Sequence, residues 1–275
     1  MPEHNTMKPY PPVPTGLAVE HDGPVLRVRL DRPDRRNSLT DAMVYALGDI
    51  IDAAGNDESV RVVLLNGSGD HFCSGFDLGE RAPGPTKPRV GSIHRRMNGH
   101  VNRLIPTMLT TQTPIVCAAR GWVIGLGLDL ALAADFTIVA DDARLWAPFT
   151  TFGFTPDSGA SWLIPRLVGV ARAKEMLLLG TKVSGTDAAQ WGLVHRAVSD
   201  GDLDAAAQEL VGRLAAGPTV ALGLTKLLVH RALSADIERH LDDEAWAMEV
   251  SSRSEDFKEY ARATREGRPP DFGGR

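Results

Sequence analysis

Two carboxylates in this sequence lie next to glycine-containing turns and could move protons near a bound ligand. Asp129 interrupts the apolar run GWVIGLGLDLALAAD, and Asp157 follows Pro156 and precedes Ser158-Gly159 in a later loop. A carboxylate held close to a substrate carbon can transfer a proton as a general acid or base. Each residue also has a purely structural interpretation. An Asp in the first turn of a helix complements the helix dipole, and an Asp before Ser and Gly is a common turn or cap residue.

Backbone N–H groups are the second kind of group that could act on a ligand. The glycines of Gly121–Gly127 lie where an apolar strand gives way to a helix, so the backbone there can approach a ligand. The first turn of that helix offers unpaired N–H groups and a positive dipole end, which suit a developing oxyanion. A second sharp turn at Gly75 would direct the amide of Phe76 outward beside Asp77, which could cap the turn that follows. The GxxxGxG spacing differs from the GxGxxG of a dinucleotide site.

The elements that must position these groups follow a repeated pattern of strand, turn and helix. Alternating apolar residues predict a hairpin over 17–21 and 25–30, and Thr40 is a predicted N-cap for the helix that comes next. Short apolar runs predict covered strands at 60–65, 115–119 and 136–140. Helical periodicity predicts further helices at 93–109, 128–134, 203–214, 219–233, 237–250 and 254–266. The chain is therefore predicted to be α/β with an all-helical end.

Length, charge and cysteine content limit the function classes. The 275 residues carry a net charge of −5, which gives no basic footprint for nucleic acid or an anionic membrane. We therefore expect a small molecule and further copies of the chain as partners. Cys73 and Cys117 lie far apart in apolar segments, so we expect neither a disulfide framework nor a metal site. The amino end lacks a signal-peptide pattern and no segment has about 18 uninterrupted apolar residues, so we expect a cytoplasmic protein.

The chain divides into three predicted regions. Pro9, Pro11, Pro12 and Pro14 predict a flexible N-terminal arm over residues 1–14, and an α/β core is expected over 15–200. Residues 201–275 are expected to form a helical region that mediates self-association, because one of its helices carries an apolar stripe of Ile237, Leu241, Ala245 and Met248. Residues 81–92, rich in Pro and Gly, predict a mobile lip.

Four segments together resemble the enoyl-CoA hydratase/isomerase (crotonase) family over about residues 15–275. They are RPDRRNSL, FCSGFDL, RGWVIGLGLDLALAAD and GFTPDSGASWLIPRLVG, in this order and spacing. The resemblance implies a crotonase-like spiral of repeated ββα units with a C-terminal helical oligomerisation region, assembled as a homotrimer or as a hexamer made of two trimers. It also implies an acyl-CoA substrate, whose coenzyme A is part of the substrate rather than a separate cofactor.

The resemblance further implies which residues form the site. Family members stabilise a thioester enolate with two backbone N–H groups, which on this chain are those of Phe76 and Leu126; one such donor is typically worth about 3 to 4 kcal/mol. The loop of Arg36 to Ser38 should lie along the coenzyme A tail, and the lip after Asp77 near the adenine. The residues expected to bind substrate are those of the matching loops: Arg36, Asn37, Ser38, Ser74, Asp77, Leu78, Gly125 and Phe149.

The carboxylates depart from the pattern of the family's hydratases, which use two glutamates. The first position holds Asp129, and the second aligns with Phe149, which cannot activate water. Asp157 falls where certain isomerases of the family place a catalytic aspartate, so we expect an isomerase with Asp157 as the principal proton-transfer group and Asp129 as the auxiliary one. Neighbouring aromatic residues should shield Asp157 from water: Phe149, Phe152, Phe154 and Trp162. The alternatives are a hydratase with an unusual carboxylate set and an acyl-CoA-binding member with weak turnover.

Overall fold

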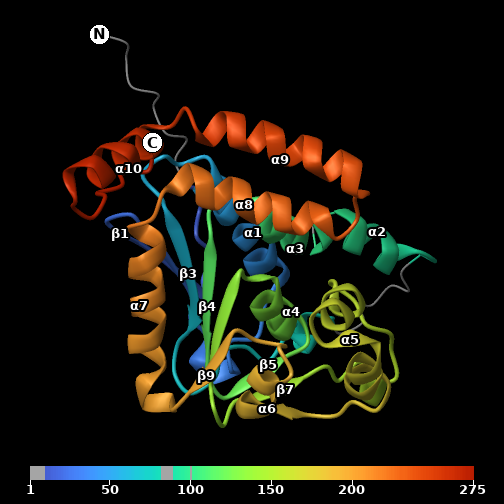
Figure 1. Ribbon diagram of the computed structural model, residues 1–275. Helices are drawn as coiled ribbons and strands as arrows, with labels where there is room; N and C mark the ends of the chain where they lie inside the picture. The colour runs from blue at the N-terminus through green and yellow to red at the C-terminus, as the bar shows by residue number, and fades with distance from the viewer. Residues whose placement is uncertain (1–9, 82–88, 100) are drawn as a thin grey trace.

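A six-stranded sheet crosses the centre of the molecule (Figure 1). The computed structural model describes residues 10–81, 89–99 and 101–275. The sheet has the order β1-β2-β3-β4-β6-β9. The hairpin of β1 (Leu17–Asp22) and β2 (Val25–Leu30) is antiparallel, as predicted. The remaining strands run parallel to their neighbours: β3 (Val62–Gly67), β4 (Ile115–Ala119), β6 (Phe136–Ala140) and β9 (Arg196–Val198).

A smaller sheet of short strands supports the turns that carry the candidate site. It consists of β5 (Trp122–Ile124), β7 (Arg144–Trp146) and β8 (Val183–Ser184), with β5 parallel and β8 antiparallel to β7. A single bridge joins Cys73 to Val123 of β5, and another joins Leu39 to Phe76. The loops after β2 and β3 are therefore attached to each other and to the smaller sheet.

Helices cover both faces of the large sheet, because its central strands β3, β4 and β6 are largely buried on both sides. On one face lie α1 (Asp41–Gly55), α3 (Leu104–Thr110) and α4 (Leu126–Ala133), which share the larger core cluster. On the other face lies α7 (Leu203–Ala215), whose Leu203, Ala207 and Val211 pack with Val62, Val116 and Ile138 (Figure 1). Thr40 caps α1, as predicted, because its side chain accepts a hydrogen bond from the Met43 amide.

The helix predicted over 93–109 is two helices. α2 (Ser92–Gly99) ends before a 3₁₀ turn at Val101–Arg103, and α3 begins at Leu104. Pro106 explains the interruption: it has no N–H, and its ring would clash with the carbonyl four residues earlier in a continuous helix. Between β7 and β8 of the smaller sheet lies α5 (Ala160–Leu178), which kinks at Gly169, and α6 (Gly185–Gln190) follows β8.

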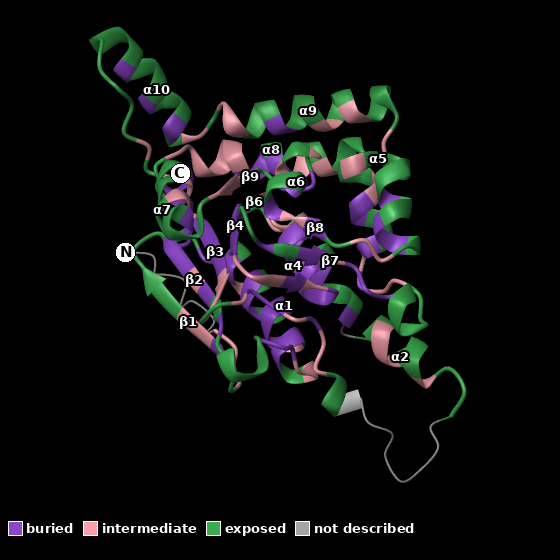
Figure 2. Cartoon of the chain, turned by 90° about the horizontal axis from the view of Figure 1, so that it is seen from below, coloured by how far each residue is buried: buried purple, intermediate pink, exposed green. Residues whose placement is uncertain are grey.

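The last three helices lie at one end of the molecule (Figure 1). They are α8 (Thr219–Ala232), α9 (Ile237–Ser251) and α10 (Glu255–Glu266), and the last two are largely exposed (Figure 2). The predicted stripe on α9 is exposed at Ile237, Leu241, Ala245 and Met248. Its role in self-association stays a prediction. No helix in the described parts of the chain has the length and hydropathy that crossing a membrane requires.

The two segments predicted to be flexible lie partly outside the described residues, namely 1–9 of the arm and 82–88 of the lip. The arm is attached to the body at Tyr10, whose hydroxyl donates a 3.2 Å hydrogen bond to Asp57. The Tyr10 ring also meets His21 edge-on, with 5.6 Å between the ring centroids. Burial, together with the Asp57 carboxylate, raises the pKa of the Tyr10 phenol. The predicted arm, residues 1–14, is thus attached to the body of the protein at Tyr10.

Candidate active site

The loops after β2 and β3 meet because the carboxyl ends of parallel strands lie at the same edge of a sheet. The amide of Leu39 donates to the Gly75 carbonyl at 2.8 Å, and the amide of Asp77 donates to the Leu39 carbonyl at 2.9 Å. The amide of Ser74 donates to the Arg36 carbonyl at 2.9 Å. These bonds hold Phe76 between two fixed neighbours, as its position as an oxyanion donor would require.

Asn37 is fully buried, and its side chain is used inside the protein. Its Oδ1 accepts from the Arg32 amide at 2.8 Å, while its Nδ2 donates to the carbonyls of Ser68 at 2.9 Å and His71 at 2.7 Å. Arg36 and Asn37 both have left-handed backbone, with φ of 50° and 54°. The side chain of Asn37 therefore ties two loops together instead of pointing toward a ligand. Of Arg36, Asn37 and Ser38, only Arg36 is exposed.

Asp77 and Ser38 also brace the loop. The Asp77 carboxylate lies 3.0 Å from Arg32 Nη1 and accepts from Ser38 Oγ at 3.3 Å. Its other oxygen accepts from the Gly79 amide at 3.0 Å, which caps the 3₁₀ turn Leu78–Arg81 as the sequence predicted. Burial opposes ionisation of Asp77, but the hydrogen bonds and the Arg32 charge outweigh it and hold its pKa below the usual range. Its charge is thus neutralised within the protein.

The turn at Gly125 places the start of α4 against Gly75. A methyl group added at Gly75, where φ is +88°, would lie 2.9 Å from the Ile124 carbonyl oxygen and 3.7 Å from the Leu126 nitrogen. Gly125 precedes α4 with φ of +53°, and its amide donates to the Trp146 carbonyl at 3.0 Å. The amide of Leu126 is in the first turn of α4 and has no carbonyl within that helix to bond. The backbone of Gly75-Phe76 therefore lies beside the N-terminus of α4.

A small cavity of about 60 Å³ lies where these turns meet. Asp157 reaches it from the loop before α5, and Phe149, only 3% exposed, forms part of its wall. Phe149 meets Phe154 edge-on, with 5.9 Å between centroids, and Phe152 stacks on Phe154. The other residues around the cavity are Ser74, Gly75, Phe76, Leu78, Ile124, Gly125, Leu126 and Pro148.

Asp129 lies in the first turn of α4 and is completely buried. Neither of its carboxylate oxygens has a hydrogen-bond partner among the described residues. Burial raises the pKa of Asp129 well above its usual value, and the charge of Asp157 raises it further. Asp129 therefore keeps its proton far above the pH at which an exposed Asp ionises, and it is electrostatically coupled to Asp157.

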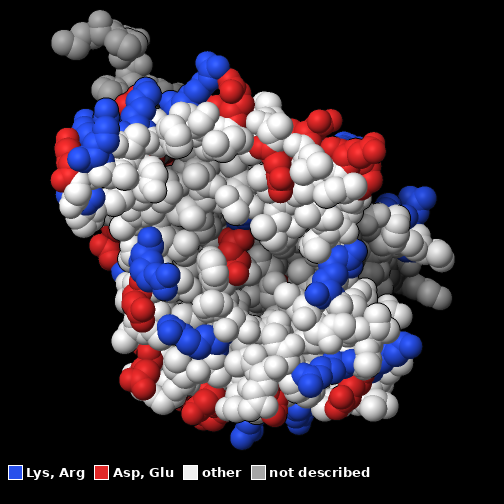
Figure 3. All heavy atoms as spheres, viewed as in Figure 1, with Lys and Arg blue, Asp and Glu red and all other residues white. Residues whose placement is uncertain are grey.

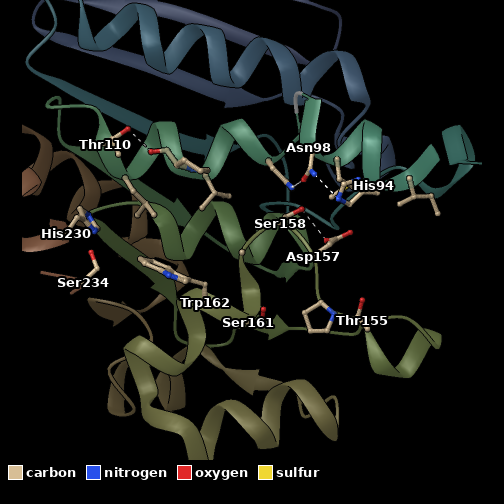
Figure 4. A pocket seen from close by; sticks show the side chains of 18 of the residues that line it. His94, Asn98, Thr110, Thr155, Asp157, Ser158, Ser161, Trp162, His230 and Ser234 are labelled. Carbon is tan, nitrogen blue, oxygen red and sulfur yellow. Dashed lines mark hydrogen bonds between the residues drawn. The ribbon is translucent and has the colours of Figure 1, made fainter. Parts of the chain in front are cut away.

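A second, larger cavity of about 920 Å³ opens on the other side of Asp157. Its walls come from α2, α3, the start of α5 and α8. Figure 4 shows Asp157 and Ser158 near His94 and Asn98 at one end, Trp162 in the middle, and His230 with Ser234 at the other end. Sequence analysis missed this cavity, because its walls combine three distant parts of the chain: α2 with α3, the start of α5, and α8.

On the face shown in Figure 3, basic and acidic side chains are interspersed around the edge, and most of the middle is uncharged. Within residues 10–81, 89–99 and 101–275, no group of three or more His, Cys, Asp or Glu side chains is placed to hold a metal ion.

Comparison with known proteins gives consistent matches along nearly the whole chain. A profile of the family described as Enoyl-CoA hydratase/isomerase matches residues 20–275. The 1,2-epoxyphenylacetyl-CoA isomerase of Escherichia coli (strain K12) is 35% identical over 251 residues, which are 91% of this chain and 95% of that protein. A protein named as a probable enoyl-CoA hydratase, from Rhodobacter capsulatus, is 35% identical over 248 residues, 90% of this chain and 94% of its own.

The fold has similar matches among solved structures. The crystal structure of an enoyl-CoA hydratase from Bacillus anthracis superimposes with a TM-score of 0.88 at 29% identity, over 95% of this chain and 100% of the other. The predicted crotonase-like α/β fold with a helical C-terminal region is thereby confirmed. The relatives include both an isomerase and hydratases, so they do not distinguish isomerisation from hydration for this chain.

Proposed function

The chain belongs to the enoyl-CoA hydratase/isomerase family of acyl-CoA enzymes, and we propose that it isomerises an enoyl-CoA through an enolate. One observation carries the choice of isomerisation. Asp157 is the one carboxylate among the described residues that line the cavity beside Phe76 and Leu126. Adding water to a double bond needs one group to activate water and another to protonate carbon. Moving a double bond needs a single group that takes a proton from one carbon and returns it to another.

The proposed enolate is held by backbone. The thioester oxygen accepts hydrogen bonds from the amides of Phe76 and Leu126, and it gains negative charge as the substrate loses a proton. Each such donor is typically worth about 3 to 4 kcal/mol of transition-state stabilisation. The N-terminus of α4 adds a positive dipole end at the same place. Glycine at 75 supports this assignment, because a side chain there would meet the Ile124 carbonyl.

The two carboxyl groups have different tasks in this proposal. Asp129 keeps its proton because it is buried and close to the charge of Asp157. Ionising both groups would bring two negative charges together, so the pair holds one proton and Asp157 is the ionised member. Asp157 then acts as the base toward substrate carbon and afterwards as the acid. Asp129 is auxiliary, since it keeps a second charge out of the site.

Coenzyme A is proposed to enter as part of the substrate, past Ser74 and Leu78, with no separate cofactor. The exposed Arg36 is the proposed contact for its phosphates. Calorimetry with free coenzyme A tests this: Arg36→Ala should weaken binding roughly tenfold, the value of one charge-assisted hydrogen bond, and less at high salt. Arg213→Ala, on α7 across the sheet, is the matched control and should bind like wild type. Equal binding by both variants would remove Arg36 from the site.

The reaction itself is tested by product mass. The protein is incubated with 2-enoyl, 3-enoyl and ring-bearing acyl-CoAs, and the products are followed by absorbance and mass spectrometry. Isomerisation changes the absorbance and leaves the mass unchanged, which is the expected result. A product heavier by one water molecule would assign a hydratase with the Asp157 and Asp129 pair. Tight binding without any product would assign an acyl-CoA-binding protein with little turnover.

A further inference from the structure

The space beyond Asp157 is far larger than the cavity in which the reaction is proposed to occur. The larger cavity, called the chamber below, has a volume of about 920 Å³, compared with about 60 Å³ for the smaller one. Asp157 lines both. An acyl group whose reactive carbons lie at Asp157 therefore has the chamber next to it.

The walls of the chamber are apolar in the middle. Met97 of α2, Ile105 and Leu109 of α3 and Leu227 of α8 contribute to them. The cation at the α8 end, Arg231, lies 3.6 Å from the Asp243 carboxylate of α9 and is thus already paired. Such walls suit an uncharged apolar group, since ligand pockets of this size bury most of their ligand against apolar side chains.

Trp162 is held in a fixed position at the centre of the chamber (Figure 4). The guanidinium of Arg166 lies over its indole, 4.0 Å from the ring centroid. Arg166 also donates a 3.1 Å hydrogen bond to the Trp162 carbonyl. The side chain remains 39% exposed, a large value for an indole inside a cavity wall. A rigid indole with one face covered by a cation offers its remaining surface to another ring, in an offset or edge-on arrangement.

Resting on the acyl-CoA isomerisation proposed above, we infer that the substrate's acyl group extends past Asp157 and ends in an apolar ring that packs on Trp162. A short enoyl group would leave the chamber filled with water against apolar walls. A ring-terminated group buries those walls and the indole together, and each buried apolar group favours binding. Trp162 and Leu227 then determine the size and shape of the acyl group, while Asp157 acts on it.

Binding of saturated acyl-CoAs tests the inference separately from the reaction, because these compounds cannot isomerise. Calorimetry compares butanoyl-CoA with a phenyl-terminated octanoyl-CoA. We expect the ring-terminated compound to bind roughly 10- to 100-fold more tightly, the range for one apolar group in a pocket. Trp162→Ala should remove most of this gain, and Trp162→Phe, which keeps a ring, should retain much of it. Leu227→Trp should reduce it, because the larger side chain occupies part of the chamber.

The matched control for the last variant is Val229→Trp, on the same helix but 60% exposed and outside the chamber walls. It should keep the gain. Equal affinity for the two compounds would overturn the inference, and so would a gain that persists in both Trp162→Ala and Leu227→Trp. Equal affinity is the result expected if a second copy of the chain occupies the chamber. If the gain depends on Trp162 but no enoyl-CoA is turned over, the proposed reaction is wrong and the binding of a ring in the chamber is supported.

Discussion

Gly127, in the first turn of α4, lies directly against Cys73. A methyl group added at Gly127 would be 2.6 Å from Cys73 Cβ and 2.9 Å from the Cys73 carbonyl oxygen. The buried Cys73 sulfur is itself 3.2 Å from the Asn37 carbonyl oxygen and 3.3 Å from the Gly75 nitrogen. The three segments that build the site therefore meet at one cysteine, and their spacing depends on the absence of a side chain at Gly127.

Gly127→Ala should damage both stability and activity. The added methyl must displace backbone, and overpacking of this kind costs about 1 to 3 kcal/mol of unfolding free energy. Turnover should fall up to about 100-fold, because a shift of about 1 Å misplaces the amides. Urea unfolding and steady-state kinetics measure the two effects. The matched control is Gly212→Ala on α7, where an added methyl has open space and should stabilise by about 0.5 to 1 kcal/mol without loss of activity. Wild-type kinetics in Gly127→Ala would show that the spacing is not critical.

Asp157→Asn should lower kcat by about 100- to 10,000-fold, the usual range for a general acid or base, because the amide cannot accept a proton. The affinity for butanoyl-CoA should stay close to that of wild type, since the change affects the transition state. Asp129→Asn, the comparison variant, should cost less, because the neutral amide resembles a protonated carboxyl. If Asp157→Asn keeps nearly full turnover while Asp129→Asn is inactive, the two roles are reversed.

The buried Asp129 should make stability depend on pH. Its pKa is raised in the folded state, whereas an Asp in the unfolded chain ionises near pH 3.9. Above that pH the unfolded chain releases a proton that the folded protein keeps, so the free energy of unfolding falls as pH rises through this window. The slope is at most about 1.4 kcal/mol per pH unit. Asp129→Asn should flatten the curve and be more stable than wild type at neutral pH.

Urea unfolding between pH 4 and 8 measures this dependence. Asp34→Asn, in an exposed turn, is the control and should follow the wild-type curve. A wild-type curve that stays parallel to that of Asp129→Asn over the whole range would mean that Asp129 is not the group responsible.

Introducing charge on α9 should weaken self-association. Leu241 and Met248 are 53% and 61% exposed, and burying each in an interface contributes about 1.5 to 3 kcal/mol. The double variant Leu241→Glu/Met248→Glu should therefore have a lower mass than wild type by light scattering at the same concentration. Asp242→Lys changes the charge of the neighbouring exposed position and should leave the mass unchanged. An unchanged mass in the double variant would place the interface elsewhere.

Five of the six strands of the large sheet were predictable, because they are short apolar runs with clear turns between them; β9, which has only three residues, was not predicted. The smaller sheet was not: β5 has three residues and β8 two, too few to show a period, and they depend on partners distant in the chain. Apolar stripes predicted both α7 and α9 as helices. Only the structure shows that the stripe of α7 covers the sheet while that of α9 is exposed. A stripe specifies that a helix has an apolar face and leaves open what covers it.

In the site, caps and turns formed by residues close in sequence were predictable, and contacts between residues distant in sequence were not. The cap formed by Asp77 and the turns at Gly75 and Gly125 follow from residue types over a few positions. The use of Asn37 to join two loops depends on carbonyls more than thirty residues away. The coupling of Asp129 to Asp157, and the chamber beyond them, likewise arise from packing between helices.

The small volume of the cavity around Asp157 affects where a deuterium label on the substrate ends up. About 60 Å³ is room for only a few water molecules, and an acyl group that also fills the chamber displaces the water from both cavities that Asp157 lines. When Asp157 has taken a deuteron from one carbon, the acceptor nearest to it is then the neighbouring carbon of the same molecule and not the solvent. Deuterium should therefore migrate along the acyl chain faster than it is lost to water. The position of the label in the product would then identify the carbons that one carboxylate reaches.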